Sequence, residues 1–345
     1  MNKENDIILD IRDLKVEFDT YGGVVQAVRG VNYKVRRGKT LAVVGESGCG
    51  KSVTVQAIMG LIPRPPGRIV SGQAFLNGKD ILNISEKEAR QYRGRDIGMI
   101  FQDPMTSLNP TMKIGTQISE TLRLHKGLNK DAAWKEAVKL MDMTKIPEAA
   151  KRANQYPFEF SGGMLQRVMI AMAVACQPQV LIADEPTTAL DVTIQDQVLE
   201  IMKDLQAEVG MSIVLITHDL GVVARMADDV AVMYAGQVIE SGPVDDIFYK
   251  SSHPYTVGLR QAMPDTDPES HKVLTPIDGS PPDLFHPPKG CSYAARCPHA
   301  MQLCQDKLPD SFDIGHQHHR LCWLQHEKAP QVNEELLHQQ HFQGV

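Results

Sequence analysis

Eight consecutive residues near the N-terminus fit the phosphate-loop pattern G-x-x-x-x-G-K-[ST] at every fixed position. They are Gly45, Glu46, Ser47, Gly48, Cys49, Gly50, Lys51 and Ser52. Glycines allow successive backbone N–H groups to face one centre, and a helix N-terminus behind them favours an anion there. Lys51 is suited to neutralise phosphate oxygens, and the Ser52 hydroxyl is suited to bind Mg²⁺. The run predicts a nucleotide phosphate site, and the alternative is a glycine turn without function.

Two adjacent carboxylates supply the second half that such a site needs. Asp184 and Glu185 follow four apolar residues, 180–183, which predict a strand buried on both faces of a parallel sheet. Ligands bind at the carboxyl ends of such strands. Asp184 is therefore a candidate ligand of Mg²⁺ through water, and Glu185 is a candidate general base for an attacking water molecule. A solvated pair of acids explains the dipeptide but not its position behind the strand.

Two further features complete an ordered set. Ser161, Gly162 and Gly163 open an apolar helical pattern, and His218 follows a predicted strand. Together with the phosphate loop and the acidic pair, they resemble the nucleotide-binding subunit of ATP-binding-cassette (ABC) transporters over residues 7–260. The resemblance implies an ATPase that binds ATP and Mg²⁺. It also implies a P-loop NTPase fold of the α/β class, with a RecA-like core, an antiparallel β subdomain and a helical subdomain.

The resemblance assigns roles to individual residues. Ser161 and its glycines cap the ATP of a partner subunit, Tyr21 stacks on adenine, and Gln102 senses the γ-phosphate and its metal. Asp191 lies in the loop that crosses the dimer interface, and His218 contacts the γ-phosphate. The alternatives are a helix start, a locally packed tyrosine, a surface turn, a helix N-cap and a structural histidine. Every catalytic position is filled, which predicts an active ATPase: Lys51, Gln102, Asp184, Glu185 and His218.

Three segments narrow the resemblance to the ATPases of oligopeptide and dipeptide importers, namely 102–110, 185–193 and 253–256. It extends to about residue 325. It implies a second ABC ATPase subunit in a heterodimer, two transmembrane permease subunits and an extracytoplasmic peptide-binding protein. The expected location is peripheral, on the cytoplasmic face of the cell membrane. Nickel importers share this type of ATPase, so nickel is the alternative solute.

Four cysteines lie within a short C-terminal stretch: Cys291, Cys297, Cys304 and Cys322. In a reducing cytosol, such a group favours metal binding over disulfides. Zinc sites usually have closer C-x(2–4)-C pairs, so these spacings favour ligands from separate turns. Related importer subunits carry a [4Fe–4S] cluster here, and the resemblance implies the same. The alternatives are Zn²⁺, for which His316, His318 and His319 lie near enough to compete, and four unbound thiols.

Hydrophobic periodicity predicts the elements that position these residues. Alternation over 7–37 predicts antiparallel strands that turn at 21–23, and the apolar run 40–44 predicts a buried strand before the phosphate loop. Helical spacing within 110–155 predicts a small helical insertion, with Asn129 as an N-cap. Residues 230–241 predict a hairpin that turns at 235–237.

Beyond about residue 250 the periodicity fades, while proline, histidine and cysteine become frequent. We therefore predict an ABC ATPase domain over 1–260, in which the helical subdomain covers about 92–160. A C-terminal segment with the four cysteines follows over 261–330. The last residues, 331–345, are polar and predict a flexible tail.

Composition limits the classes of function. Of 345 residues, 42% are hydrophobic, which is typical of a globular protein, and the net charge is −6. That charge disfavours nucleic acid as a partner. No apolar run is long enough to cross a bilayer, and the first six residues do not resemble a secretory signal. A single cassette without a long insertion also argues against the soluble ABC ATPases of translation or DNA repair, a less favoured alternative.

Overall fold

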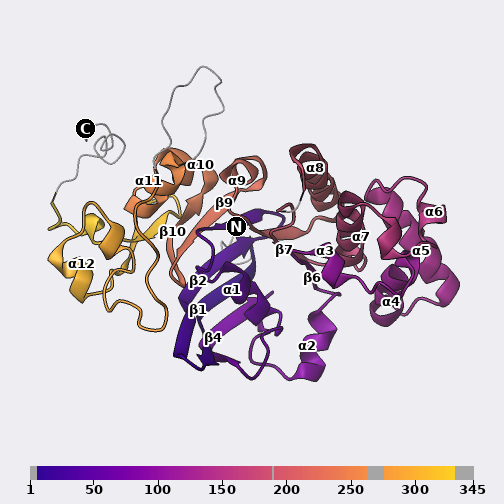
Figure 1. Ribbon diagram of the computed structural model, residues 1–345, viewed down its shortest axis with the longest axis horizontal. Helices are drawn as coiled ribbons and strands as arrows, with labels where there is room; N and C mark the ends of the chain where they lie inside the picture. The colour runs from indigo at the N-terminus through magenta and orange to yellow at the C-terminus, as the bar shows by residue number, and fades with distance from the viewer. Residues whose placement is uncertain (1–5, 189, 263–275, 331–345) are drawn as a thin grey trace, which may run out of the picture. The chain divides into compact units, whose positions relative to one another are not determined.

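The computed structural model describes residues 6–188, 190–262 and 276–330. The chain forms two compact units, each made of separate stretches of sequence. The first unit contains Met1–Asp10, Lys34–Leu41 and Ala74–Thr217. The second unit contains Ile11–Tyr33, Ala42–Gln73 and His218–Val345. Figure 1 labels the helices and strands and colours them by position in the chain.

The N-terminal strands form the predicted sheet. The four strands β1 (Ile7–Thr20), β2 (Gly23–Arg36), β4 (Gly67–Leu76) and β5 (Lys79–Asp80) lie in the order β2-β1-β4-β5. Leu14 and Val16 are completely buried while Lys15 between them is half-buried, as the alternation of side chains along a strand with one buried face requires. The turn at 21–23 that the sequence predicts is confirmed by the gap between β1 and β2.

A parallel sheet forms the centre of the first unit. Strands β6 (Ile97–Ile100), β7 (Val180–Asp184) and β8 (Ser212–Ile216) pair in parallel, with Ile97 opposite Val180 and Val180 opposite Ser212. Every residue of these strands is buried, which explains why the sequence has continuous apolar runs there. Parallel pairing places the carboxyl ends of all three strands at one edge of the sheet.

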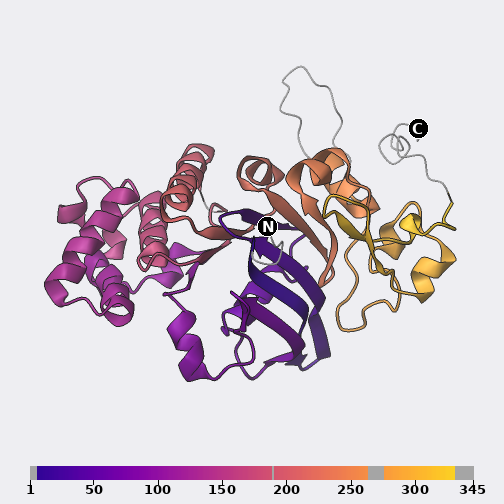
Figure 2. The same cartoon turned by 180° about the vertical axis from the view of Figure 1, so that it is seen from behind.

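The first unit also contains a series of helices. They are α2 (Glu86–Tyr92), α3 (Pro104–Ser107), α4 (Ile114–Lys126), α5 (Lys130–Met143), α6 (Ala149–Arg152), η2 (Pro157–Glu159), α7 (Gly162–Val174) and α8 (Val192–Val209). The helices α4, α5 and α6 lie side by side in both views (Figures 1 and 2). Ile114, Ile118 and Leu122 are completely buried in this group. Asn129 accepts a hydrogen bond from the Ala132 N–H, so the predicted N-cap and helical insertion are confirmed.

The second unit carries the phosphate loop and a hairpin. Strand β3 (Thr40–Val44) ends in this unit and leads through the loop into α1 (Lys51–Ile58). The predicted hairpin is confirmed as β9 (Asp229–Tyr234) and β10 (Gln237–Pro243), with α9 (Leu220–Met226) before it. Helices α10 (Val244–Tyr249) and α11 (Pro254–Gln261) follow. Their apolar side chains pack on the hairpin in a core that includes Tyr234, Tyr255 and Tyr293.

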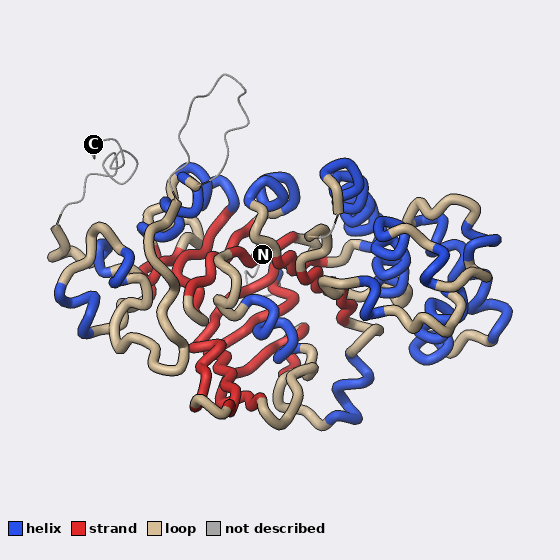
Figure 3. Tube along the Cα trace, in the orientation of Figure 1, coloured by secondary structure: helices blue, strands red, loops and turns tan. Residues whose placement is uncertain are grey.

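The C-terminal segment is mostly loop, as Figure 3 shows. Its elements are η3 (Ala294–Arg296), α12 (Gln302–Asp306), β11 (Ser311–Asp313), β12 (His319–Leu321) and η4 (Trp323–Gln325). Strand β12 pairs antiparallel with β10, with Arg320 opposite Glu240. The segment therefore continues the sheet of the hairpin, and the predicted domain boundary at 260 stays a prediction. The predicted tail, 331–345, lies outside the described residues.

A buried polar cluster fastens this segment to β10. Glu240 is 1% exposed, and its carboxylate accepts hydrogen bonds from the Ser252 N–H at 3.0 Å and the His253 N–H at 3.3 Å. His318 Nε2 lies 2.9 Å from the same carboxylate and is itself buried. Such a buried charge is tolerated because its hydrogen-bond partners surround it.

Along the described stretches of chain, no helix combines the length and the apolar character needed to cross a bilayer.

Candidate nucleotide-binding site

The phosphate loop has a shape that only glycine permits at two points. Gly45 has φ +150°, and a Cβ there would lie 2.1 Å from the Met233 carbonyl oxygen. Gly50 has φ +98°, and a Cβ there would lie 2.5 Å from the Ala27 carbonyl oxygen. The Gly236 N–H also donates to the Cys49 carbonyl oxygen at 3.0 Å. The β9–β10 hairpin and strand β2 therefore support the loop from outside, which fixes its path.

The side chains of the loop divide into buried and exposed groups. Lys51 is 6% exposed, and its Nζ donates to the carbonyl oxygens of Gly45 at 2.8 Å and Glu46 at 3.0 Å. Ser47 and Gly48 are exposed, and Ser52 is half-buried at the start of α1. Burial raises the pKa of the Cys49 thiol, so this residue is a neutral packing group. The ammonium group thus lies within a curled backbone, as binding of phosphate oxygens requires.

The acidic strand end has the predicted position. Asp184 is the last residue of β7 and is 4% exposed. Glu185 follows with φ +48°, and its N–H donates to the Ile216 carbonyl oxygen at 3.0 Å. A positive φ is strained for glutamate, and this hydrogen bond to the neighbouring strand helps to hold it. The strain turns the chain sharply at the point where the sequence predicts a general base.

The structure brings two of the predicted catalytic residues together. The Gln102 side-chain amide donates to Glu185 Oε2 at 3.0 Å, although 83 positions separate the two residues. Thr188 Oγ1 donates to the same oxygen at 3.0 Å. Gln102 follows β6 and Glu185 follows β7, so the parallel pairing of these strands explains the approach. Two donors on one carboxylate oxygen hold the Glu185 side chain in one orientation.

The remaining predicted residues are found at element ends. Ser161 caps α7, and its hydroxyl accepts from the Met164 N–H at 3.4 Å. Asp191 caps α8 by accepting from the Ile194 N–H at 3.0 Å, so the N-cap interpretation is confirmed. His218 is exposed directly beyond β8, and Tyr21 is fully exposed in the turn after β1. Their roles toward nucleotide stay predictions.

Glycine again permits a close approach at the start of α7. A Cβ on Gly163 would lie 2.6 Å from the Ile194 side chain, whereas Gly162 faces open space. Ser161 and Gly162 are both exposed. The start of α7 is therefore accessible at the surface, and a helix N-terminus favours an anion there.

The four cysteines lie close enough to influence one another. Cys304 and Cys322 are buried, and the Cys291 N–H donates to the Cys304 carbonyl oxygen at 2.7 Å. Burial raises the pKa of Cys297 to about 12 and that of Cys322 to about 11, and the neighbouring thiols add to both shifts. Such thiols are protonated at neutral pH unless a cation stabilises the thiolates.

No preassembled ion site accompanies these thiols. Among the described residues, no group of three or more histidine, cysteine, aspartate and glutamate side chains is arranged to hold a metal ion. The Nε2 atom of His318 faces the buried carboxylate of Glu240, and its role as a zinc ligand stays a prediction. His316 and His319 are exposed.

Two residues beside the phosphate loop and one beside the turn at 21–23 have no assigned role in the sequence analysis. Arg296 forms an ion pair with Glu46, and the Tyr255 hydroxyl accepts from the Glu46 N–H at 2.9 Å. Phe285 lies against the turn before β2, where a Cβ on Gly22 would be 3.3 Å from its ring. All three come from residues beyond 250. The cysteines that flank Arg296 and the segment 253–256 were the local signals that this stretch has a function.

The fold and motifs agree with known ATP-binding cassettes. A family profile described as ABC transporter matches residues 28–188. The dimeric post-hydrolysis structure of the ATP-binding cassette MJ0796 with ADP and phosphate matches with a TM-score of 0.62 at 26% identity. That match covers 68% of this chain and 98% of the cassette. These matches define the class as an ABC-type ATPase.

Longer matches define the branch of that class. The profile of the oligopeptide/dipeptide transporter C-terminal region matches residues 239–304. The oligopeptide transport ATP-binding protein OppD of Bacillus subtilis is 57% identical over 325 residues, which is 94% of this chain and 91% of the relative. The dipeptide transport ATP-binding protein DppD of the same organism is 53% identical over 93% of this chain and 96% of its own length. The chain belongs to the ATP-binding proteins of oligopeptide and dipeptide ABC transporters.

Proposed function

We propose that this chain binds Mg·ATP and hydrolyses it to power the import of oligopeptides or dipeptides across a membrane. The observation that carries the proposal is similarity to peptide transport ATP-binding proteins over nine-tenths of the chain, with all catalytic positions filled. The glycine-shaped phosphate loop and the oriented Glu185 supply the physical support. Nickel import by the same type of ATPase is the alternative.

Each predicted residue has a proposed task. The loop amides and Lys51 bind the phosphates, and Ser52, Gln102 and Asp184 hold Mg²⁺ directly or through water. Glu185 accepts a proton from the water whose oxygen attacks the γ-phosphorus. The bond from that phosphorus to the β–γ bridging oxygen breaks, which gives ADP and inorganic phosphate. Bound Mg²⁺ offsets the negative charge that develops on the phosphate oxygens.

The residues at element ends complete the proposal. Tyr21 stacks on adenine, and its full exposure leaves its ring accessible. His218 contacts the γ-phosphate. Ser161 with its glycines caps the nucleotide of a second ABC ATPase subunit, and Asp191 lies at that interface. This subunit pair works with two permease subunits and an extracytoplasmic peptide-binding protein, so the chain is peripheral to the cytoplasmic face of the cell membrane.

We further propose that the four cysteines hold a [4Fe–4S] cluster rather than zinc. A single tetrahedral zinc ion binds each thiolate at about 2.3 Å, so its ligands must crowd together. In a cluster each thiolate binds a different iron, so the ligands stand farther apart. The four free cysteines of this stretch carry the proposal, because four thiolates are the ligand set of such a cluster. Bound metal would stabilise a segment that has little apolar core.

Iron and acid-labile sulfide, measured after anaerobic purification, test the cluster. We expect about four of each per chain. Stoichiometric zinc without sulfide would refute this part of the proposal and leave the ATPase assignment intact. A Cys297→Ser variant serves as the control, since it removes one of the four ligands and should lower the iron content.

Uptake of labelled peptides tests the main proposal. Cells with the intact protein are compared with cells that carry Lys51→Ala, using labelled di-, tri- and pentapeptides. We expect uptake to be lost in the variant, because the phosphate loop loses its one ammonium group. Unchanged peptide uptake, with the variant protein present and no redundant transporter, would contradict peptide import. Loss of nickel uptake instead would favour the alternative solute.

A further inference from the structure

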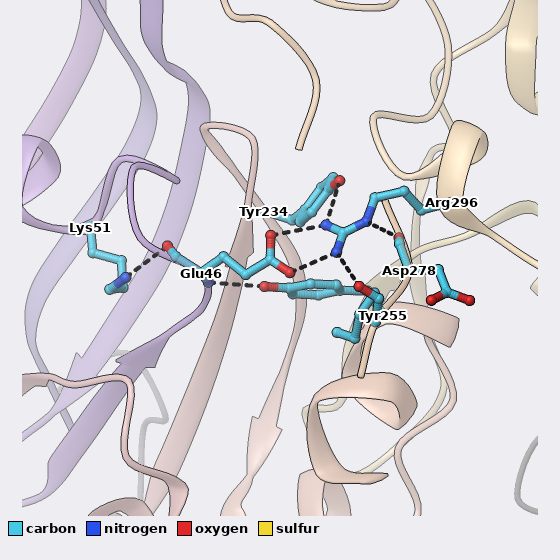
Figure 4. Close-up of polar contacts among 7 residues, drawn as sticks. Glu46, Lys51, Tyr234, Tyr255, Asp278 and Arg296 are labelled. Atoms are coloured by element: carbon cyan, nitrogen blue, oxygen red, sulfur yellow. Dashed lines mark hydrogen bonds and ion pairs between the residues drawn. The ribbon is translucent and has the colours of Figure 1, made fainter. Parts of the chain in front are cut away.

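Every polar group of Glu46, the second residue of the phosphate loop, has a partner. Its N–H donates to the Tyr255 hydroxyl at 2.9 Å, and its carbonyl oxygen accepts from Lys51 Nζ at 3.0 Å. Its carboxylate accepts two hydrogen bonds from Arg296, at 2.9 Å and 3.0 Å. Figure 4 shows this chain of contacts from Lys51 through Glu46 to Arg296. The loop is thus fastened at both its backbone and its side chain.

The guanidinium of Arg296 is held in a single orientation. The Arg296 side chain is 6% exposed, while the Glu46 side chain is 25% exposed. The guanidinium of Arg296 also donates to the Asp278 carbonyl oxygen at 2.8 Å and to the Ile277 carbonyl oxygen at 3.1 Å. It also donates to the Tyr234 hydroxyl at 3.2 Å. Among the described residues, Glu46 is the carboxylate that balances its charge, and a paired, fully bonded arginine of this kind is rigid.

Arg296 belongs to the cysteine segment. It ends η3, between Cys291 and Cys297, and its N–H donates to the Tyr293 carbonyl oxygen at 3.0 Å. The neighbouring Ser292 accepts a hydrogen bond from Arg29 at 2.8 Å, which fastens the same turn to β2. The turn that carries two of the four cysteines therefore also presents an arginine to the phosphate loop.

The charge of this pair matters for an anionic ligand. The affinity of the loop for a triphosphate is raised by Lys51 and by the backbone amide groups of the loop. An unpaired carboxylate nearby lowers that affinity by electrostatic repulsion. Glu46 lies five positions before Lys51 in the same loop, so an unpaired charge there opposes nucleotide binding. Because the pair is largely buried, salt screens it weakly, and loss of one partner leaves a poorly solvated charge on the other.

We propose that Arg296 is a positioning residue for nucleotide binding, which neutralises and holds Glu46 and so makes the phosphate loop depend on the cysteine segment. The inference rests on the proposed function, since it assumes that the loop binds a nucleotide. Arg296 acts through Glu46 and does not itself contact the phosphates. Disturbance of the cysteine turn is expected to reach the nucleotide by this route.

The test is equilibrium binding of Mg·AMP-PNP to the purified full-length chain by calorimetry. Arg296→Gln is expected to raise the Kd about tenfold, since it leaves the Glu46 carboxylate unpaired beside a polyanion. Glu46→Gln alone is expected to change the Kd by less than about twofold, because it removes the repulsive charge together with the ion pair. The double variant is expected to bind like Glu46→Gln, so the second substitution rescues the first.

That rescue separates the proposal from a purely structural role. If the role of Arg296 is only to hold Ile277 and Asp278 by hydrogen bonds, Glu46→Gln cannot restore nucleotide binding. The double variant then binds Mg·AMP-PNP as weakly as Arg296→Gln. Wild-type affinity of Arg296→Gln would overturn the proposal equally. Arg68→Gln is the matched control, because Arg68 forms a similar pair with Glu17 at the surface and should leave binding unchanged.

Two further variants keep the test decisive. If Arg296→Gln does not fold by circular dichroism, Arg296→Lys replaces it and is expected to raise the Kd about threefold, since lysine keeps the charge but not the two-point contact. Failure of Glu46→Gln to cancel that increase would overturn the proposal. Lys51→Ala should abolish binding in every background. Absence of Mg·AMP-PNP binding by the intact chain would refute the proposed function. Binding by the intact chain without an effect of Arg296→Gln would refute only the role of Arg296.

Discussion

The acidic strand end and the phosphate loop are held in place by different kinds of contact. Glu185 is positioned by the pairing of strands and by Gln102 and Thr188, which lie in the same unit of the parallel sheet. Glu46 is positioned by Arg296, 250 positions away in a segment with little regular structure. Changes near Glu185 should therefore affect the chemical step, and changes in the C-terminal segment should affect nucleotide binding.

The largest expected effect is that of a substitution of Glu185, which should lower the rate of hydrolysis without changing the affinity for nucleotide. Glu185→Gln should lower steady-state phosphate release by about 100- to 1000-fold, because the general base is lost. The affinity for Mg·ATP should stay within about threefold, since the phosphate loop is unchanged. The matched control is Glu200→Gln on the exposed face of α8, which should leave both quantities unchanged. Normal hydrolysis by Glu185→Gln would remove the catalytic assignment.

A backbone substitution tests how tightly the loop is packed. Gly45→Ala should lower the free energy of unfolding by about 2–4 kcal/mol and weaken nucleotide binding, because its Cβ would lie 2.1 Å from the Met233 carbonyl oxygen. Gly315→Ala is the control, since Gly315 also has a positive φ but faces open space. Urea unfolding and Mg·AMP-PNP binding measure the two effects. Equal losses of stability in both variants would show that the cost comes from backbone strain and not from the contact with Met233.

The attachment of the C-terminal segment can be weakened without touching the loop. Glu240→Gln should lower the free energy of unfolding by about 3 kcal/mol, because it breaks a buried network that includes His318 and Ser252. Glu17→Gln, which breaks an exposed pair with Arg68, should cost under about 1 kcal/mol. Chemical denaturation of both variants at pH 7 gives the comparison. An equal cost would contradict a fastening role for the buried cluster.

The smallest effect is a pH dependence of stability in the same segment. Burial lowers the pKa of His253 from 6.5 to about 4, and His253 Nδ1 accepts from the Tyr255 N–H at the start of α11. Between pH 6.5 and pH 4 the unfolded chain binds a proton on His253 that the folded chain does not. The free energy of unfolding should therefore fall by about 2–3 kcal/mol between pH 6.5 and pH 4.

His253→Asn isolates this contribution, because asparagine keeps an acceptor at the N-cap but does not titrate. Urea unfolding at a series of pH values should give a shallower slope for the variant between pH 4 and pH 6.5. The same slope for both proteins would show that other groups control the acid limb. Above pH 7 both proteins should have nearly the same pH dependence.

The local elements of the fold were predictable from short patterns. The strand before the phosphate loop, the N-cap Asn129, the hairpin turn at 235–237 and the buried strand before Asp184 all appear where the sequence indicates. Each depends on residues within a few positions of one another. The approach of Gln102 to Glu185 came from the structure, because no strand was predicted before Gln102, and it is the parallel pairing of β6 with β7 that brings the two residues together.

The contacts of the C-terminal segment were not predictable in this way. Nothing near Arg296 in the sequence indicates that it faces Glu46, and nothing near His318 indicates a buried carboxylate partner. Such pairs depend on how segments far apart in the chain pack, and a single sequence carries no periodicity that records this.

The sequence by itself determined the chemistry of this protein, because a phosphate loop requires glycines, a lysine and a hydroxyl at fixed spacing, and a buried strand requires an apolar run before its acids. The tertiary structure alone decided how the loop is held. Glu46 needs a cation because it is partly buried, and the fold supplies one from the cysteine segment. The pairing of Glu46 with Arg296 depends on how segments far apart in the sequence pack together, and local residue spacing does not encode that packing.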